Sequence, residues 1–89
     1  MAQLGMDPEA VRALARKLEQ DAGTIEQIRS ALGGQLQNVV WTGRDSEQFR
    51  EQWSNTHAPA LTRVIEALRE AGAKANSNAA AQEQTSASL

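Results

Sequence analysis

The sequence predicts an all-α protein: an antiparallel helix-turn-helix hairpin that dimerises into a four-helix bundle. Two segments carry apolar residues every three or four positions, the spacing of one helix face. They flank the tripeptide Trp41-Thr42-Gly43, near the middle of an 89-residue chain. No segment shows the apolar–polar alternation of a strand. A chain of this length fits one small domain.

The first segment predicts a long helix over about residues 7–40, after a frayed stretch over residues 1–6. Asp7 can cap the helix, Pro8 suits its first position, and Glu9 suits its positive end. The apolar stripe consists of Val11, Leu14, Leu18, Ala22, Ile25, Ile28, Leu32, Leu36 and Val39. Gly33 and Gly34 each cost about 1 kcal/mol in a helix. We therefore expect the helix to loosen, bend or end there.

The second segment predicts a turn over residues 41–43 and a helix over about residues 44–75. Thr42 is expected to cap this helix, with Asp45 completing a capping box. Its apolar stripe consists of Phe49, Trp53, Ala60, Leu61, Val64, Leu68, Ala71 and Ala75. Pro59 removes a helical N–H donor and predicts a kink or a split. Residues 76–89 are mainly Ala, Ser, Gln and Asn, so we expect a flexible tail.

Two helices alone cover only part of these stripes. Burying one bulky apolar side chain contributes about 1.5–3 kcal/mol, whereas ordering such a chain costs on the order of 100 kcal/mol. An apolar stripe left exposed is an interface by default. We therefore expect a second hairpin, identical or related, to complete the bundle.

Composition argues against several functional classes. Lys plus Arg is 9 and Asp plus Glu is 11, which offers no basic stripe for nucleic acid. There is no Cys and one His, so we expect no metal site and no cofactor. No serine lies in a nucleophile motif, so we expect neither an enzyme nor a small-molecule substrate. The beginning of the chain lacks signal-peptide features, and we expect synthesis in the cytoplasm without a cleavable signal.

The central tripeptide has both a structural and a familial interpretation. Trp41 can cover the open end of the hairpin, and Gly43 can give the backbone freedom to turn. Together with Phe49 and Trp53, and with Pro59-Ala60-Leu61, the tripeptide resembles the WXG-motif family of small type VII secretion substrates, the ESAT-like proteins.

This resemblance implies a hairpin that dimerises with itself or with a paralogous WXG protein. It also implies export in folded form by a membrane complex with an FtsK-like ATPase. The implied export signal is composite: the Trp-x-Gly corner of one hairpin lies beside a C-terminal Tyr-x-x-x-Asp/Glu of its partner. On this interpretation Trp41, Thr42 and Gly43 form the export motif, and the protein is secreted.

The chain departs from that pattern because it contains no Tyr. The nearest tail candidates, Asn78, Gln82 and Glu83, lack an aromatic residue. Either the partner supplies the tail signal, a different tail is recognised, or this protein is not exported. A cytosolic helical adaptor is the alternative function. A membrane-active hairpin is disfavoured because the polar faces carry mixed charge.

Overall fold

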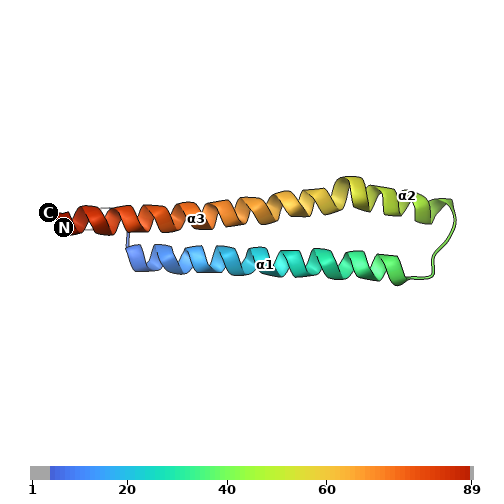
Figure 1. Cartoon of the computed structure of the whole chain (residues 1–89), viewed down its shortest axis with the longest axis horizontal. Coiled ribbons are helices and arrows are strands. Elements are labelled where there is room, and N and C mark those ends of the chain that lie inside the picture. The colour runs from blue at the N-terminus through green and yellow to red at the C-terminus, as the bar shows by residue number, and fades with distance from the viewer. Residues whose placement is uncertain (1–4, 89) are drawn as a thin grey trace.

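The computed structural model describes residues 5–88, and side chains through residue 85, as two antiparallel helical arms joined at one end (Figure 1). The predicted all-α hairpin is confirmed. The molecule measures 68 × 17 × 14 Å, so it is a thin rod. Its elements, in chain order, are α1 (Pro8–Asn38), α2 (Arg44–Gln52), the π-helical segment η1 (Trp53–His57) and α3 (Ala58–Ser88).

Helix α1 begins as expected and continues through its glycine pair. The Asp7 carboxylate accepts hydrogen bonds from the backbone N–H groups of Glu9 at 3.1 Å and Ala10 at 3.4 Å. The helix does not break at Gly33 or Gly34 and ends at Asn38. The cost of about 1 kcal/mol per glycine is small beside the packing of a 31-residue helix along a second arm.

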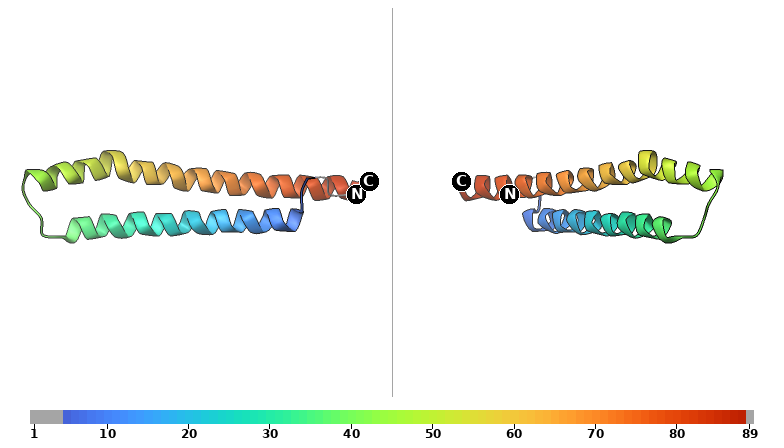
Figure 2. Two further views of the ribbon diagram at one scale, coloured as in Figure 1. Left: turned by 180° about the vertical axis from the view of Figure 1, so that it is seen from behind. Right: turned by 45° about the vertical axis from the view of Figure 1, so that its right-hand side comes forward.

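The second arm is continuous but changes its winding directly before Pro59. The backbone N–H of Ala58 donates to the carbonyl of Trp53, one residue wider than an α-helical bond. A widened turn places the proline, which has no N–H, at a point where the regular hydrogen-bond pattern is already interrupted. Figure 2 shows the resulting bulge between α2 and α3 in both views.

Small side chains form the contact between the two arms. Ala15 and Ala22 of α1 are almost fully buried, as are Gly72 and Ala79 of α3, and Ile65 is the one large side chain among these buried residues. The members on each helix recur every seven residues, which keeps them in one row. We call this row the seam. A Cβ added to Gly72 would lie 3.2 Å from the Ala15 carbonyl oxygen, so the backbones approach closely.

The two sides of the seam differ in chemistry. Helical geometry places the predicted apolar stripes on one side, which we call the apolar side. Several of its members remain exposed, among them Leu14 at 54 %, Ile28 at 48 % and Val64 at 46 %. The other side carries ion pairs across the hairpin: Arg69 contacts Glu19 at 3.3 Å and Glu26 at 3.2 Å.

The apolar stripe predicted on the second helix lacks one residue that forms the seam. It contains Leu61, Val64 and Leu68 but omits Ile65, which is 2 % exposed. The difference arises because a broad apolar stripe contains two adjacent rows. The closest backbone approach selects the row that includes Gly72, which lies seven residues after Ile65.

The expected flexible tail also needs a correction. Helix α3 continues to Ser88 instead of ending near Ala75, and Ala79 is fully buried. Arg12 of α1 forms an ion pair with Glu83. Figure 1 shows this part of α3 running beside the start of α1 and then extending past it. Ala79 is enough to hold this segment against α1, because the two backbones are too close along the seam for a bulky side chain to be required.

Replacing Gly72 with Leu tests the close approach at the seam. We expect the free energy of unfolding to fall by about 1–3 kcal/mol, the usual cost of overpacking. Gly23→Ala is the matched control, since a Cβ there meets nothing within 4 Å, and it should raise stability by up to about 1 kcal/mol. Denaturant unfolding at one fixed protein concentration measures both. A Gly72→Leu variant as stable as the parent would contradict the packing described above.

Lowering the pH tests the contact that holds the end of α3. The hydrogen bond from Arg12 lowers the pKa of Glu83 and raises the pKa of Arg12. Ionised Glu83 therefore stabilises the docked helix above the ordinary carboxyl pKa of about 4.3. This contribution is lost as the pH falls through the lowered pKa.

We expect the helical ¹³Cα shifts of residues 79–85 to weaken over that acidic window. The same shifts should be weaker in Glu83→Gln already at neutral pH, with less further change on acidification. Equal titration of the parent and Glu83→Gln would show that other carboxylates control this segment.

Candidate functional site

The tripeptide Trp41-Thr42-Gly43, which we call the corner, connects the two arms in extended backbone (Figure 1). The last helical bond of the first arm runs from the Val39 N–H to the Gln35 carbonyl at 3.0 Å. Gly43 has φ 108° and ψ 179°, a conformation that side chains with a Cβ disfavour. Any other residue at position 43 would strain this turn.

Thr42 does not cap the second arm, contrary to expectation. Helix α2 begins one residue later, with Gly43 at the cap position, and no side chain caps it. The Gly43 carbonyl accepts the first helical bond from the Glu47 N–H at 3.0 Å. Because the backbone turns at Gly43, Thr42 lies outside the first turn. Asp45 lies within that turn, where its charge suits the helix dipole.

Aromatic rings gather beside the corner. The Trp41 and Phe49 ring centroids lie 5.3 Å apart with an interplanar angle of 55°, a favourable tilted arrangement. Trp41 nevertheless remains 38 % exposed. The rings border an apolar hollow of about 340 Å³ at the closed end of the hairpin. It is lined by Leu32, Gln35, Leu36, Val39, Trp41, Phe49 and Trp53.

Two polar side chains from α2 hold the backbone of the corner. The Ser46 hydroxyl, 2 % exposed, donates to the Trp41 carbonyl at 2.7 Å. Arg50 donates from Nε to the Ser46 hydroxyl at 2.9 Å and from Nη1 to the Leu36 carbonyl at 2.6 Å. The corner is thus fastened to the end of α1 and to α2 at once.

The structure separates the predicted site residues into three groups. Leu32, Leu36, Phe49 and Trp53 meet Trp41 at the corner. The other predicted stripe residues lie along the apolar side or near the seam: Val11, Leu14, Leu18, Ile25, Ile28, Leu61, Val64 and Leu68. The tail candidates Asn78, Gln82 and Glu83 lie in the last third of α3, and Figure 1 shows that α3 ends at the other end of the 68 Å rod from the corner. The chain's own tail cannot sit beside its own corner.

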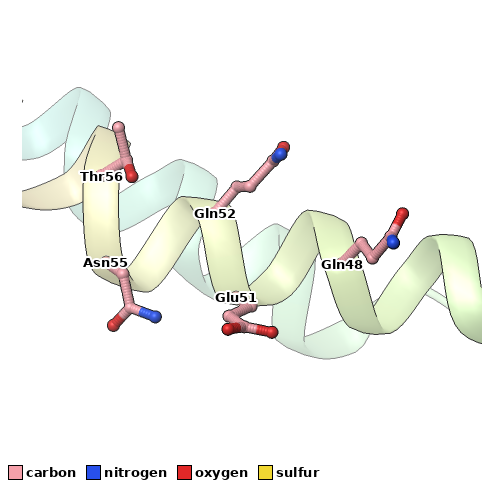
Figure 3. A pocket seen from close by; sticks show the side chains of 5 residues that line it. All are labelled: Gln48, Glu51, Gln52, Asn55 and Thr56. Carbon is pink, nitrogen blue, oxygen red and sulfur yellow. The ribbon is translucent and has the colours of Figure 1, made fainter.

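No catalytic arrangement emerges elsewhere among the described residues. A shallow polar depression on α2 and η1 is lined by Gln48, Glu51, Gln52, Asn55 and Thr56. Figure 3 shows that these side chains diverge: Gln52 and Thr56 point to one side, and Glu51 and Asn55 to the other. Residues 5–88 hold no cluster of three potential metal-ligating His, Cys, Asp or Glu side chains. Within the same residues, no helix is long and apolar enough to span a membrane.

The sequence prediction missed the contacts that Ser46 and Arg50 make with the corner. Their spacing of four residues places both on one helix face. This spacing was the only indication in the sequence that the two residues act together, and many exposed pairs on helices have the same spacing. Their role depends on two carbonyl groups outside α2, which only the folded chain brings within reach.

A family model described as "Proteins of 100 residues with WXG" matches residues 3–86. A search of curated proteins and a search of solved structures returned no significant match. The family match spans nearly the whole hairpin, and the corner supplies the Trp-x-Gly. The chain therefore belongs to the WXG100 family of small ESAT-like proteins.

Proposed function

We propose that the chain is a non-enzymatic, dimeric substrate of a type VII secretion system, or the partner and adaptor of such a substrate, exported in folded form. The observation that carries this proposal is the corner. Trp41 remains 38 % exposed, although Phe49 and two polar side chains hold it in place. An aromatic ring that is both fixed and accessible suits recognition by an export ATPase.

The shape of the molecule supports dimerisation. The radius of gyration is 19.8 Å, against about 12 Å for a compact domain of this length. The accessible surface is 6615 Å², whereas a compact monomer of this mass exposes about 5,100 Å². The excess, about 1,500 Å² on this one chain, is larger than the roughly 800 Å² that each partner contributes to a specific interface of standard size. The apolar side offers the surface for that interface.

The length of the rod favours an antiparallel pair. The corner and the tail lie at opposite ends of one hairpin (Figure 1). An antiparallel partner would place its own tail beside this corner. The composite signal implied by the family then requires two chains, and the partner can contribute the Tyr that this chain lacks. The partner is a second copy or a paralogous WXG protein.

Placing a charge on the apolar side tests the dimer. We expect Ile28→Glu to shift the protein to monomer, because the new carboxylate would be buried without a partner. Gln27→Glu adds the same charge at the neighbouring exposed residue, which lies about 100° around the helix from Ile28 and outside the apolar stripe, and it should leave the dimer intact. Sedimentation analysis at micromolar concentration measures both, with the paralogue present if the chain pairs only with it. A stable, well-folded monomer of the parent under both conditions would refute the dimer.

Removing the corner ring tests export. We expect Trp41→Ala to abolish appearance of the protein outside the producing cell while the dimer persists. Val40→Ala is the matched control, because Val40 is the neighbouring residue and is 97 % exposed. Immunodetection in culture medium and in cell lysate measures the exported fraction. Export of Trp41→Ala at the parent level would contradict the proposed role of the corner.

The missing Tyr favours one alternative, a cytosolic helical adaptor. Such an adaptor would form the same dimer but remain in the producing cell. The export measurement on the parent protein separates the two functions. Retention of the parent alone and with its partner would identify the adaptor.

A further inference from the structure

The backbone of the corner lacks the supports that usually fix a turn. Residues 39–43 belong to no helix, and no side chain caps the start of α2. The carbonyl of Leu36 lies in the last turn of α1, where helical partners run out. The carbonyl of Trp41 lies in the extended segment. Both groups need donors from elsewhere in the chain.

Helix α2 supplies those donors from a single face. The buried Ser46 hydroxyl donates to the Trp41 carbonyl, and Arg50 Nη1 donates to the Leu36 carbonyl. Arg50 Nε also donates to the Ser46 hydroxyl, so the two side chains orient one another. Phe49, between them in sequence, contacts the Trp41 ring. One turn of α2 therefore holds both the carbonyl and the ring of Trp41.

Arg50 also places a positive charge at the C-terminal end of α1. The last turn of α1 contains no basic residue, although the carbonyl end of a helix favours positive charge. The guanidinium supplies that charge from another helix. Its planar fork lets different nitrogens reach different acceptors, which the single ammonium group of a lysine cannot reproduce.

We propose that Ser46 and Arg50, which we call the corner clamp, are positioning residues for Trp41. This inference rests on the proposed export function. The clamp fixes the backbone on which the ring is carried, so that the ring is presented in one orientation before any partner arrives. A site ordered in advance binds more tightly because less conformational freedom is lost on binding.

Three variants test the clamp: Ser46→Ala, Arg50→Ala and Arg50→Lys. Arg16→Ala is the matched control, since it removes the same charge from an exposed position of α1. Hydrogen–deuterium exchange reports on the peptide that covers residues 37–46. Immunodetection reports the exported fraction. Circular dichroism and sedimentation check that helix content and oligomeric state are retained.

Ser46→Ala removes two hydrogen bonds of the corner, and Arg50→Ala removes three. We expect each variant to raise exchange in residues 37–46 and to lower export about tenfold or more, since each loses at least one charge-assisted hydrogen bond. Exchange in the seam should not change. Arg50→Lys retains the charge but carries its N–H donors on a single nitrogen, so its export should lie between those of Arg50→Ala and the parent. Arg16→Ala should match the parent in every measurement.

The results distinguish a failure of the clamp proposal from a failure of the proposed export function. Parent-level export of Ser46→Ala and Arg50→Ala, with Trp41→Ala blocked, would overturn the clamp and leave the export role of the corner intact. Normal export of Trp41→Ala would overturn the proposed function itself. Faster exchange spread equally over the seam would show a general stabilising role and would also overturn the clamp. If the parent is retained in the cell, exchange confined to residues 37–46 still decides whether the clamp fixes the corner.

Discussion

The close approach of two backbones along the seam is the constraint on which the remaining structure depends. A Cβ on Gly72 would lie only 3.2 Å from the Ala15 carbonyl oxygen, and Ala22 and Ala79 continue the same narrow contact. Small side chains bury little apolar area, so the seam alone gives the hairpin limited stability. Its importance is geometric, because it sets the spacing and the register of two long helices.

Because small residues form the seam, most bulky apolar side chains lie beside it and not within it. Leu14, Ile28 and Val64 are about half exposed, whereas the opposite flank carries ion pairs such as Arg69 with Glu26. The hairpin therefore has a polar side that is complete in itself and an apolar side that is not. This asymmetry supports the proposal that the apolar side meets a second chain.

The same extended shape separates the two ends of the molecule. The corner lies at one end, and the segment near Glu83 lies at the other. The seam cannot reach the corner, where the chain leaves helical structure, so the corner depends on local contacts. Phe49 packs against the Trp41 ring, and Ser46 and Arg50 donate hydrogen bonds to the backbone of the corner and of the end of α1. Polar contacts that include the buried Ser46 thus support an accessible apolar surface.

The sequence by itself determined the two helical arms, the corner, the start of α1 at Asp7 and Pro8, and the family. These follow from local chemistry and from a repeat of three to four residues. Only the tertiary structure decided which row of the second helix forms the seam, that Gly43 rather than Thr42 caps α2, and that α3 continues through Ala79 to Ser88. An alanine or a glycine adds little to a hydrophobic pattern in the sequence. Such a residue nevertheless decides where two helices pack, because only a small side chain fits where the two backbones come close.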